Sequence, residues 1–226
     1  MKKINIFYRH YNIQGNDLKN RPTRFDFEKC FTNLLKTIEG KNIDLHVIMD
    51  GDVETNFINK YKDKYTLHTI YARNDYGSYL ETYKYIKSLN LTDTDLIYFL
   101  ENDYLHVDDW HEKIIDLFNT YDVDGYVSLY DCLDKYTSPD YTDLVSHIYV
   151  TKTSHWRTTP STCGSYIITK KIFDDDEDIN TGGPGDHHKF LWLSKNRGRL
   201  VLSPIPSLST HGVSNLMAPL INWDTI

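Results

Sequence analysis

Short apolar segments alternate with longer amphipathic segments through the first 120 residues, and this alternation constrains the fold more than any other feature of the sequence. The short segments have the length and apolar content of strands, and the longer ones place apolar residues at helical spacing. Repeated strand, helix, strand units predict a parallel sheet whose crossovers are right-handed. The predicted strands of this part span residues 3–8, 44–49, 66–71 and 95–100.

The segment 95–100 is apolar almost throughout, which is typical of a strand covered on both faces. The alternation is less regular in the second half, and a polar loop over 131–144 is expected to cover a site. No linker divides the chain. We therefore predict one α/β, Rossmann-like domain, residues 1–226, with a mostly parallel central sheet flanked by helices. The strands predicted for the second half are 125–130, 147–151, 165–169 and 200–202, with a short helix over 186–195.

Composition narrows the classes of protein that this chain can belong to. The 226 residues include 40% hydrophobic residues, enough for a sizeable core. Lys and Arg number 25 against 32 Asp and Glu, a net charge of −7, which argues against binding nucleic acid by counterion release. Three distant cysteines, with neither a signal-peptide pattern nor a membrane-length apolar run, favour a cytoplasmic protein without a transmembrane segment. The acidic run 174–178 is expected to be a solvated turn near a helix end.

Charged side chains follow each of the first four predicted strands. In an open parallel sheet, ligands bind beyond the carboxyl ends of the strands, so these residues are expected to share one edge. The sequences at those strand ends are Tyr8-Arg9-His10, Asp50-Gly51-Asp52, Arg73-Asn74-Asp75 and Glu101-Asn102-Asp103.

Glu101 and Asp103 follow the buried strand directly, one residue apart. Two carboxylates at this spacing can face one divalent cation, and hard oxygen ligands suit Mg²⁺ or Mn²⁺. The alternative is that both acids only form a turn. The metal interpretation is favoured, because such sites need a buried strand that runs straight into two acids.

The order of Asp50-Gly51-Asp52, Ala72-Arg73-Asn74 and Glu101-Asn102-Asp103 resembles that of the nucleotide-sugar glycosyltransferases of the GT-A fold, especially compact, single-domain, family 2-like members. The resemblance covers most of residues 3–212. It implies a nucleotide-sugar-binding half, 1–104, and an acceptor-binding half with a C-terminal tail, 105–226. It also implies a nucleotide diphosphate-sugar donor and a glycan or other hydroxyl acceptor.

Within that resemblance, Asp50 lies near the nucleotide base, and Asp52 and Asn102 of the same motifs are assigned to donor binding. Asp103 holds the metal on the donor diphosphate. Glu101 stands where an Asp is usual, which leaves open whether it binds the metal directly or through water.

Asp186 follows the glycine-rich segment Gly182-Gly183-Pro184-Gly185, at the start of a predicted helix. Family 2-like enzymes place their catalytic acid in a comparable position, and a carboxylate can take the proton of an acceptor hydroxyl. This role implies inversion at the anomeric carbon. An ordinary N-cap aspartate is an equally good interpretation.

His211 follows the last predicted strand, and the resemblance implies a third metal ligand there, since neutral imidazole binds Mn²⁺. A surface histidine is the alternative. Arg9, Arg73 and Arg157 are candidates for the diphosphate, because a guanidinium pairs with phosphate oxygens.

The acceptor pocket is assigned to the segment around Trp156, Gly164 and Ser165. Trp156 either stacks on a sugar or closes the core.

The resulting prediction is a metal-dependent glycosyltransferase that inverts the configuration at the anomeric carbon. Two alternatives stay open: a noncatalytic sugar or sugar-nucleotide binding module, and a nucleotidyltransferase. A nucleotidyltransferase typically has a glycine-rich basic loop after its first strand, whereas residues 12–21 of this chain contain one glycine. Nothing in the spacing identifies the sugar, the base or the acceptor.

Overall fold

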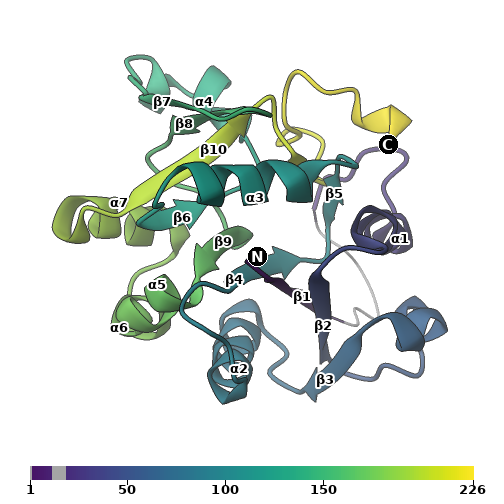
Figure 1. Cartoon of the computed structure of the whole chain (residues 1–226). Helices are drawn as coiled ribbons and strands as arrows, with labels where there is room; N and C mark the ends of the chain where they lie inside the picture. The colour runs from purple at the N-terminus through teal and green to yellow at the C-terminus, as the bar shows by residue number, and fades with distance from the viewer. Residues whose placement is uncertain (1, 12–18) are drawn as a thin grey trace.

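The computed structural model describes residues 2–11 and 19–226. Its main sheet has nine strands in the order β3-β2-β1-β4-β9-β6-β10-β8-β7 (Figure 1). The first four strands in this order pair in parallel with their neighbours, as the alternating pattern predicts. These strands are β1 (Ile4–Tyr11), β2 (Ile43–Asp50), β3 (Thr66–Ile70) and β4 (Leu96–Glu101).

The rest of the main sheet mixes directions. Strand β9 is antiparallel to both β4 and β6, β10 is parallel to β6, and β8 is antiparallel to both β10 and β7. Among the described strands of the main sheet, only β8 and β9 therefore run opposite to the rest. The predicted mostly parallel sheet is confirmed. The bounds are β6 (Gly125–Val127), β7 (Ile148–Val150), β8 (His155–Thr158), β9 (Tyr166–Thr169) and β10 (Leu200–Ile205).

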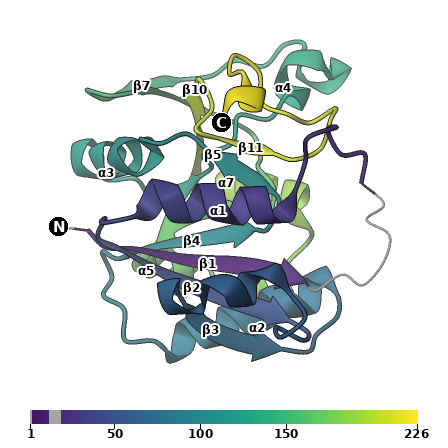
Figure 2. The same ribbon diagram turned by 90° about the vertical axis from the view of Figure 1, so that its right-hand side faces the viewer.

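A second, two-stranded sheet joins β5 (Tyr104–His106) to β11 (Ser209–His211). Figure 2 shows the two strands side by side above α1. Neither strand was predicted, and nor was β8. Each has three or four residues, too few for periodicity to reveal, and the partner strand is distant in sequence.

Helices cover both faces of the main sheet (Figure 1). Helices α1 and α3 pack on one face, and α2, α5 and α7 pack on the other. The helices are α1 (Phe27–Ile38), α2 (Asp75–Ser88), α3 (Trp110–Thr120), α4 (Asp134–Thr137), α5 (Lys170–Asp175), α6 (Glu177–Gly182) and α7 (Asp186–Arg197). The 3-10 turns are η1 (Phe57–Lys64), η2 (Pro139–Tyr141) and η3 (Trp223–Thr225).

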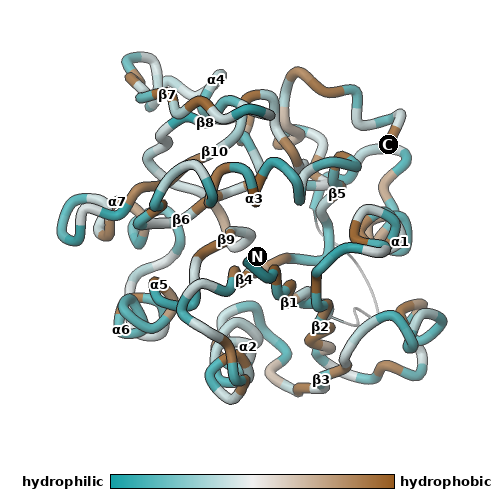
Figure 3. The backbone as a smooth tube through the Cα atoms, viewed as in Figure 1, coloured by the Kyte–Doolittle hydropathy of each residue, from teal (hydrophilic) through white to brown (hydrophobic). Residues whose placement is uncertain are grey.

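The central strands are apolar on both faces, so each face carries its own core. Tyr8 packs with Phe31 of α1, whereas its neighbour Phe7 belongs to the opposite core with Tyr83 and Phe173. In Figure 3 the hydrophobic colours gather along central strands such as β2 and β4. Within the described residues, no helix has the length and apolar character needed to cross a lipid bilayer.

The C-terminal tail packs back on the domain. Trp223 is buried, and its indole N–H donates to the carbonyl of Ala218 at 2.9 Å. The acidic run 174–178 is not wholly solvated, because Asp176 is fully buried and pairs with Arg197 and Arg199. Trp223 thus joins the core beneath α1 and α3, and the acidic run is tied to α7 and β10 by ion pairs.

Candidate functional site

A cavity of about 470 Å³ opens at the carboxyl ends of β1, β2 and β4. This is the edge at which the sequence predicts ligand binding. It is lined by Arg9, Tyr11, Lys19, Asp50, Arg73, Asn74, Asp75, Ser78, Glu101, Asn102 and Asp103. We refer to it below as the donor cavity.

Asp50 ends β2 and is only 1% exposed. Its Oδ2 accepts a hydrogen bond from the backbone N–H of Arg73 at 2.7 Å, while its Oδ1 is buried without a hydrogen-bond partner in the described structure. Burial raises the pKa of Asp50, although the backbone N–H of Arg73 acts in the opposite direction. The carboxylate therefore has one free acceptor beside a cavity, which suits a ligand N–H or O–H.

Arg73 adopts a left-handed backbone conformation, with φ of 55°. This conformation is costly for a residue with a side chain and persists where the surroundings fix it. Here it turns the N–H of Arg73 toward Asp50 and leaves the exposed side chain at the cavity wall. Asn74 then caps α2 through its Oδ1, which accepts from the N–H of Gly77 at 2.7 Å.

Arg9 and Glu101 face each other from paired positions of β1 and β4. Arg9 is 7% exposed; its Nη2 lies 3.4 Å from Glu101 Oε1, and its Nη1 lies 3.0 Å from Asp75 Oδ1. Burial raises the pKa of Glu101, and the Arg9 charge opposes that rise. Ser165 supports the pair, because its Oγ accepts the backbone N–H of Glu101 at 3.1 Å.

Gly164 lies directly against this ion pair. A Cβ at Gly164 would come within 3.2 Å of Glu101 Oε1 and 3.3 Å of Arg9 Nη2, so a side chain there would crowd both groups. Asn102, the residue between the two acids, places its Nδ2 3.1 Å from His10 Nδ1. Burial lowers the pKa of His10 to about 4, so this imidazole is neutral near pH 7.

Asp103 is 1% exposed, and three cationic or imidazole groups surround one of its oxygens. Its Oδ2 accepts from Lys19 Nζ at 2.8 Å and Arg21 Nη1 at 2.8 Å, and it lies 3.1 Å from His211 Nε2. Burial alone would raise the pKa of this carboxyl, but the hydrogen bonds and charges of His211 and Lys19 hold it well below its usual range. Asp103 is therefore a fixed negative charge.

The small sheet explains why Asp103 meets a residue more than 100 positions later. His211 pairs with Tyr104 in the β5–β11 register, and the N–H of Gly212 donates to the Asp103 carbonyl at 2.7 Å. Gly212 also passes so close to Phe25 that a Cβ would lie 2.4 Å from the ring. Only glycine fits this close approach, which holds the end of β11 against Asp103.

The metal set predicted from the sequence is assembled only in part. Asp103 and His211 converge, but Glu101 is turned to Arg9, and no cluster of three metal-ligating side chains occurs within residues 2–11 and 19–226. Asp103 Oδ1 is buried and has no hydrogen-bond partner there. One carboxylate and one imidazole fit Mn²⁺ or Mg²⁺ whose other ligands are water and phosphate oxygens.

A second cavity, of about 330 Å³, adjoins the donor cavity, and both are lined by Arg9 and Asp75. It also includes Gly164 and the segment 183–186. We call it the Asp186 cavity. The two cavities therefore lie side by side, with Arg9 and Asp75 in the wall of each.

Asp186 is the first residue of α7, and the N-cap is Gly185, so its carboxylate makes no capping bond. The N-cap interpretation is therefore not what the structure shows. The side chain is 47% exposed, and its Oδ1 lies 3.6 Å from Lys189 Nζ. Lys189 is itself buried among the rings of Tyr79, Tyr166 and Phe190, and burial lowers its pKa.

Three predicted site residues lie elsewhere. Trp156 is fully buried in the core and lines neither cavity, so the core alternative is correct. Arg157 lies on β8, and its Nη2 is held by buried Asp131 at 2.6 Å. It lines neither cavity. Asp52 is exposed and accepts the N–H of Glu54 at 2.9 Å, as a turn former does, and it does not line the donor cavity.

Sequence reasoning missed Lys19, Arg21, Asp75 and Lys189 as site residues. Lys19 and Arg21 lie in a segment without periodicity, so no pattern could place them. Lys189 follows Asp186 closely in the sequence. Its spacing of three residues from Asp186, one helical turn, was the available signal.

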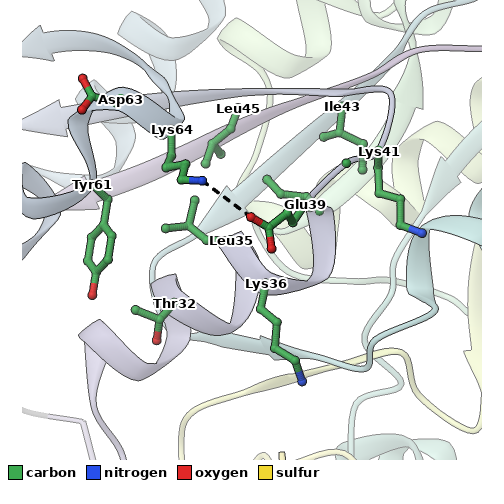
Figure 4. A pocket seen from close by; sticks show the side chains of 12 residues that line it. Thr32, Leu35, Lys36, Glu39, Lys41, Ile43, Leu45, Tyr61, Asp63 and Lys64 are labelled. Atoms are coloured by element: carbon green, nitrogen blue, oxygen red, sulfur yellow. Dashed lines mark ion pairs between the residues drawn. The ribbon is translucent and has the colours of Figure 1, made fainter.

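Another cavity of about 470 Å³ lies beside α1, η1 and the start of β2 (Figure 4). Figure 4 shows the ion pair between Lys64 and Glu39, 3.6 Å apart, among its lining side chains. It contacts the beginning of β2, opposite the end that carries Asp50, and contains none of the predicted site residues.

Comparison of the sequence with protein-family models and with curated proteins gives no match. Solved structures do match the fold. The crystal structure of Staphylococcus aureus TarS 1–349 superposes with a TM-score of 0.54 at 12% identity over 89% of this chain and 57% of that chain. The chain has a GT-A-like fold.

Two further structures extend the likeness. A protein of Desulfovibrio desulfuricans G20 assigned as a nucleotide-diphospho-sugar transferase matches with a TM-score of 0.50 at 12% identity, over 90% of this chain and 80% of that one. CMP:2-keto-3-deoxy-manno-octonic acid synthetase complexed with CTP gives 0.55 at 9% identity, over 89% of both chains. The chain spans 57% of TarS 1–349 and 37% of the longer TarS structure. At these identities, the likeness concerns the fold.

Proposed function

We propose that the protein transfers a sugar from a nucleotide diphosphate-sugar to a hydroxyl acceptor, with inversion at the anomeric carbon. The observation that carries the proposal is that the two neighbouring cavities share Arg9 and Asp75 in their walls. A donor that extends from Asp50 toward Asp103 would leave its sugar near the shared wall. An acceptor in the Asp186 cavity would then approach it from the other side.

Donor recognition would start at Asp50, whose unpaired Oδ1 accepts an N–H of the base. Arg73 lines the same cavity with an exposed guanidinium that suits phosphate oxygens. Asp103 and His211 would hold Mn²⁺ or Mg²⁺, which supplies positive charge to the departing diphosphate when bound. Glu101 would act through Arg9, which it helps to hold at the shared wall.

Asp186 would accept the proton of the acceptor hydroxyl. The acceptor oxygen forms a bond to the anomeric carbon, and the bond from that carbon to the phosphate oxygen breaks. The nucleoside diphosphate leaves with the electron pair. Lys189 keeps the Asp186 side chain near the cavity through their 3.6 Å contact.

A nucleotidyltransferase is the second candidate, because the fold superposes over 89% of both chains on the CMP:2-keto-3-deoxy-manno-octonic acid synthetase. Lys19 and Arg21 also place two cations after the first strand, where such an enzyme needs basic groups. This candidate predicts release of pyrophosphate from a nucleoside triphosphate and a sugar or sugar phosphate.

The test is release of nucleoside diphosphate from a panel of UDP-, GDP- and dTDP-sugars, with Mn²⁺, with Mg²⁺ and with chelator. Metal-dependent release from one donor supports the proposal. Pyrophosphate release from a triphosphate in parallel reactions supports the second candidate instead. Metal-dependent nucleotide binding without turnover, with acceptors supplied, would identify a binding module and refute the proposal.

A further inference from the structure

The ammonium group of Lys19 lies between the two side chains that the proposed function assigns to a metal ion. Its Nζ is 2.8 Å from Asp103 Oδ2 and 3.3 Å from His211 Nε2. A cation bound by this carboxylate and this imidazole would need the same space. The Lys19 ammonium thus places a positive charge where the divalent ion is expected.

Arg21, the other cation at Asp103, is held far more firmly. Its Nη1 donates to Asp103 Oδ2 at 2.8 Å and to the Gly212 carbonyl at 2.8 Å. Its guanidinium also lies 4.2 Å from the Phe25 ring centre and 5.1 Å from that of Phe27. With 14% of its side chain exposed, Arg21 is fixed beside Asp103.

Lys19 differs from Arg21 in exposure and in position. Its side chain is 48% exposed, and it lines the donor cavity. Because 48% of the Lys19 side chain is exposed, water can solvate its ammonium once another cation takes its place at the buried Asp103 carboxylate. Along the cavity wall it can then pair with a phosphate oxygen of the donor.

We propose that Lys19 is an internal competitor for the metal ion: its ammonium holds the place between Asp103 and His211, and the divalent ion must displace it. The proposal rests on the proposed function, because it takes the metal site from there. Its consequence is weak metal binding by the protein alone. Binding becomes tighter when a donor diphosphate offers the displaced ammonium another partner.

The experiment measures Mn²⁺ binding by the full chain without nucleotide, from the electron paramagnetic resonance signal of free Mn²⁺. K19M should lower the dissociation constant at least tenfold relative to wild type. K87M is the matched control, because Lys87 is 40% exposed, makes a 2.8 Å ion pair with Glu177 and changes the net charge equally. K87M should leave the dissociation constant within twofold of the wild-type value.

Two further variants separate the possible failures. H211Q in the K19M background should abolish the tight binding, and K19Q should repeat the effect of K19M if the methionine disturbs folding. Equal affinities of wild type and K19M, with binding still lost in K19M/H211Q, would overturn the competition while keeping the metal site. Binding that H211Q does not change would overturn the metal site itself, and with it this inference. If K19M and K87M tightened Mn²⁺ binding equally, the change in net charge would explain the effect, and the inference would be overturned.

Discussion

Asp103 and Asp186 line the two adjoining cavities and are held in contrasting ways. Asp103 is 1% exposed and has Lys19, Arg21 and His211 around one oxygen. Asp186 is 47% exposed, and its ion-pair partner, Lys189, lies 3.6 Å away. A carboxylate held by several cations keeps its charge but cannot easily take up a proton. The exposed Asp186 carboxylate is open to an acceptor, so the difference supports the roles proposed above, which are charge stabilisation by Asp103 and proton transfer by Asp186.

The largest expected effect concerns Asp186. In D186N the side chain keeps its shape but cannot accept the acceptor proton, so the turnover of sugar transfer should fall roughly 1,000-fold. Nucleotide binding should stay within twofold of wild type, since Asp186 does not line the donor cavity. Turnover is measured as nucleoside diphosphate released, and binding by calorimetry. Undiminished turnover in D186N would refute the proposed role of Asp186 in proton transfer.

Asp103 should matter for folding as well as for activity. D103N leaves the positive charges of Lys19 and Arg21 without their shared carboxylate, and Arg21 is mostly buried. The free energy of unfolding should fall by roughly 3 kcal/mol, as when one partner of a buried ion pair is removed. Urea unfolding of D103N, with D186N as the matched control, measures this. A loss equal to that of D186N would show that the two carboxylates do not differ as described.

The pH dependence of stability sharpens the same contrast. The pKa of Asp103 is lowered on folding, so its contribution is present above the unfolded value of about 4 and is lost as the pH falls below it. The difference in unfolding free energy between wild type and D103N should therefore be constant from pH 7 to about pH 5 and shrink below pH 4. Urea melts across this range measure it. A difference that grew on acidification would contradict the assigned direction of the shift.

The smallest effect is expected at Asp50, the far end of the donor cavity. Asparagine can keep the hydrogen bond from the N–H of Arg73 while presenting an NH₂ group where Oδ1 now lies. Nucleotide affinity should weaken about tenfold, through loss of one charge-assisted hydrogen bond. D50N should unfold no more easily than wild type near pH 7, because burial already raises the pKa of Asp50 and thereby disfavours its charged form. Calorimetric titration with the nucleoside diphosphate tests the affinity, and unchanged binding would exclude Asp50 from base recognition.

The first half of the fold was predictable because its strands and helices carry long, regular patterns. The strand predicted over 95–100 is β4 in the structure. Its residues are apolar on both faces, which predicts a central place in the sheet. Its end also fixed the positions of Glu101 and Asp103, since parallel strands present their carboxyl ends at one edge. The strands β5, β8 and β11 were not predictable, because tertiary pairing with distant segments forms them.

The same distinction holds within the site. Arg9, Asp50, Arg73 and Asn102 line the donor cavity because each lies at or near the carboxyl end of a strand that the pattern located. Trp156 and Arg157 were misplaced because β8 is too short for its pattern to reveal a strand, and both side chains are buried there. The cluster of Lys19, Arg21 and His211 around Asp103 depends on contacts spanning most of the chain, which no local spacing encodes.

The most direct test of the account is a crystal structure of the protein grown with Mn²⁺ and the nucleoside diphosphate that binds best. We expect the nucleotide in the donor cavity, with its base beside Asp50, and the anomalous signal of Mn²⁺ between the diphosphate, Asp103 and His211, with Lys19 moved away. A nucleotide bound beside α1 and η1, in the cavity of Figure 4, would contradict the assignment of the active site. So would a donor cavity without nucleotide in crystals grown at millimolar ligand.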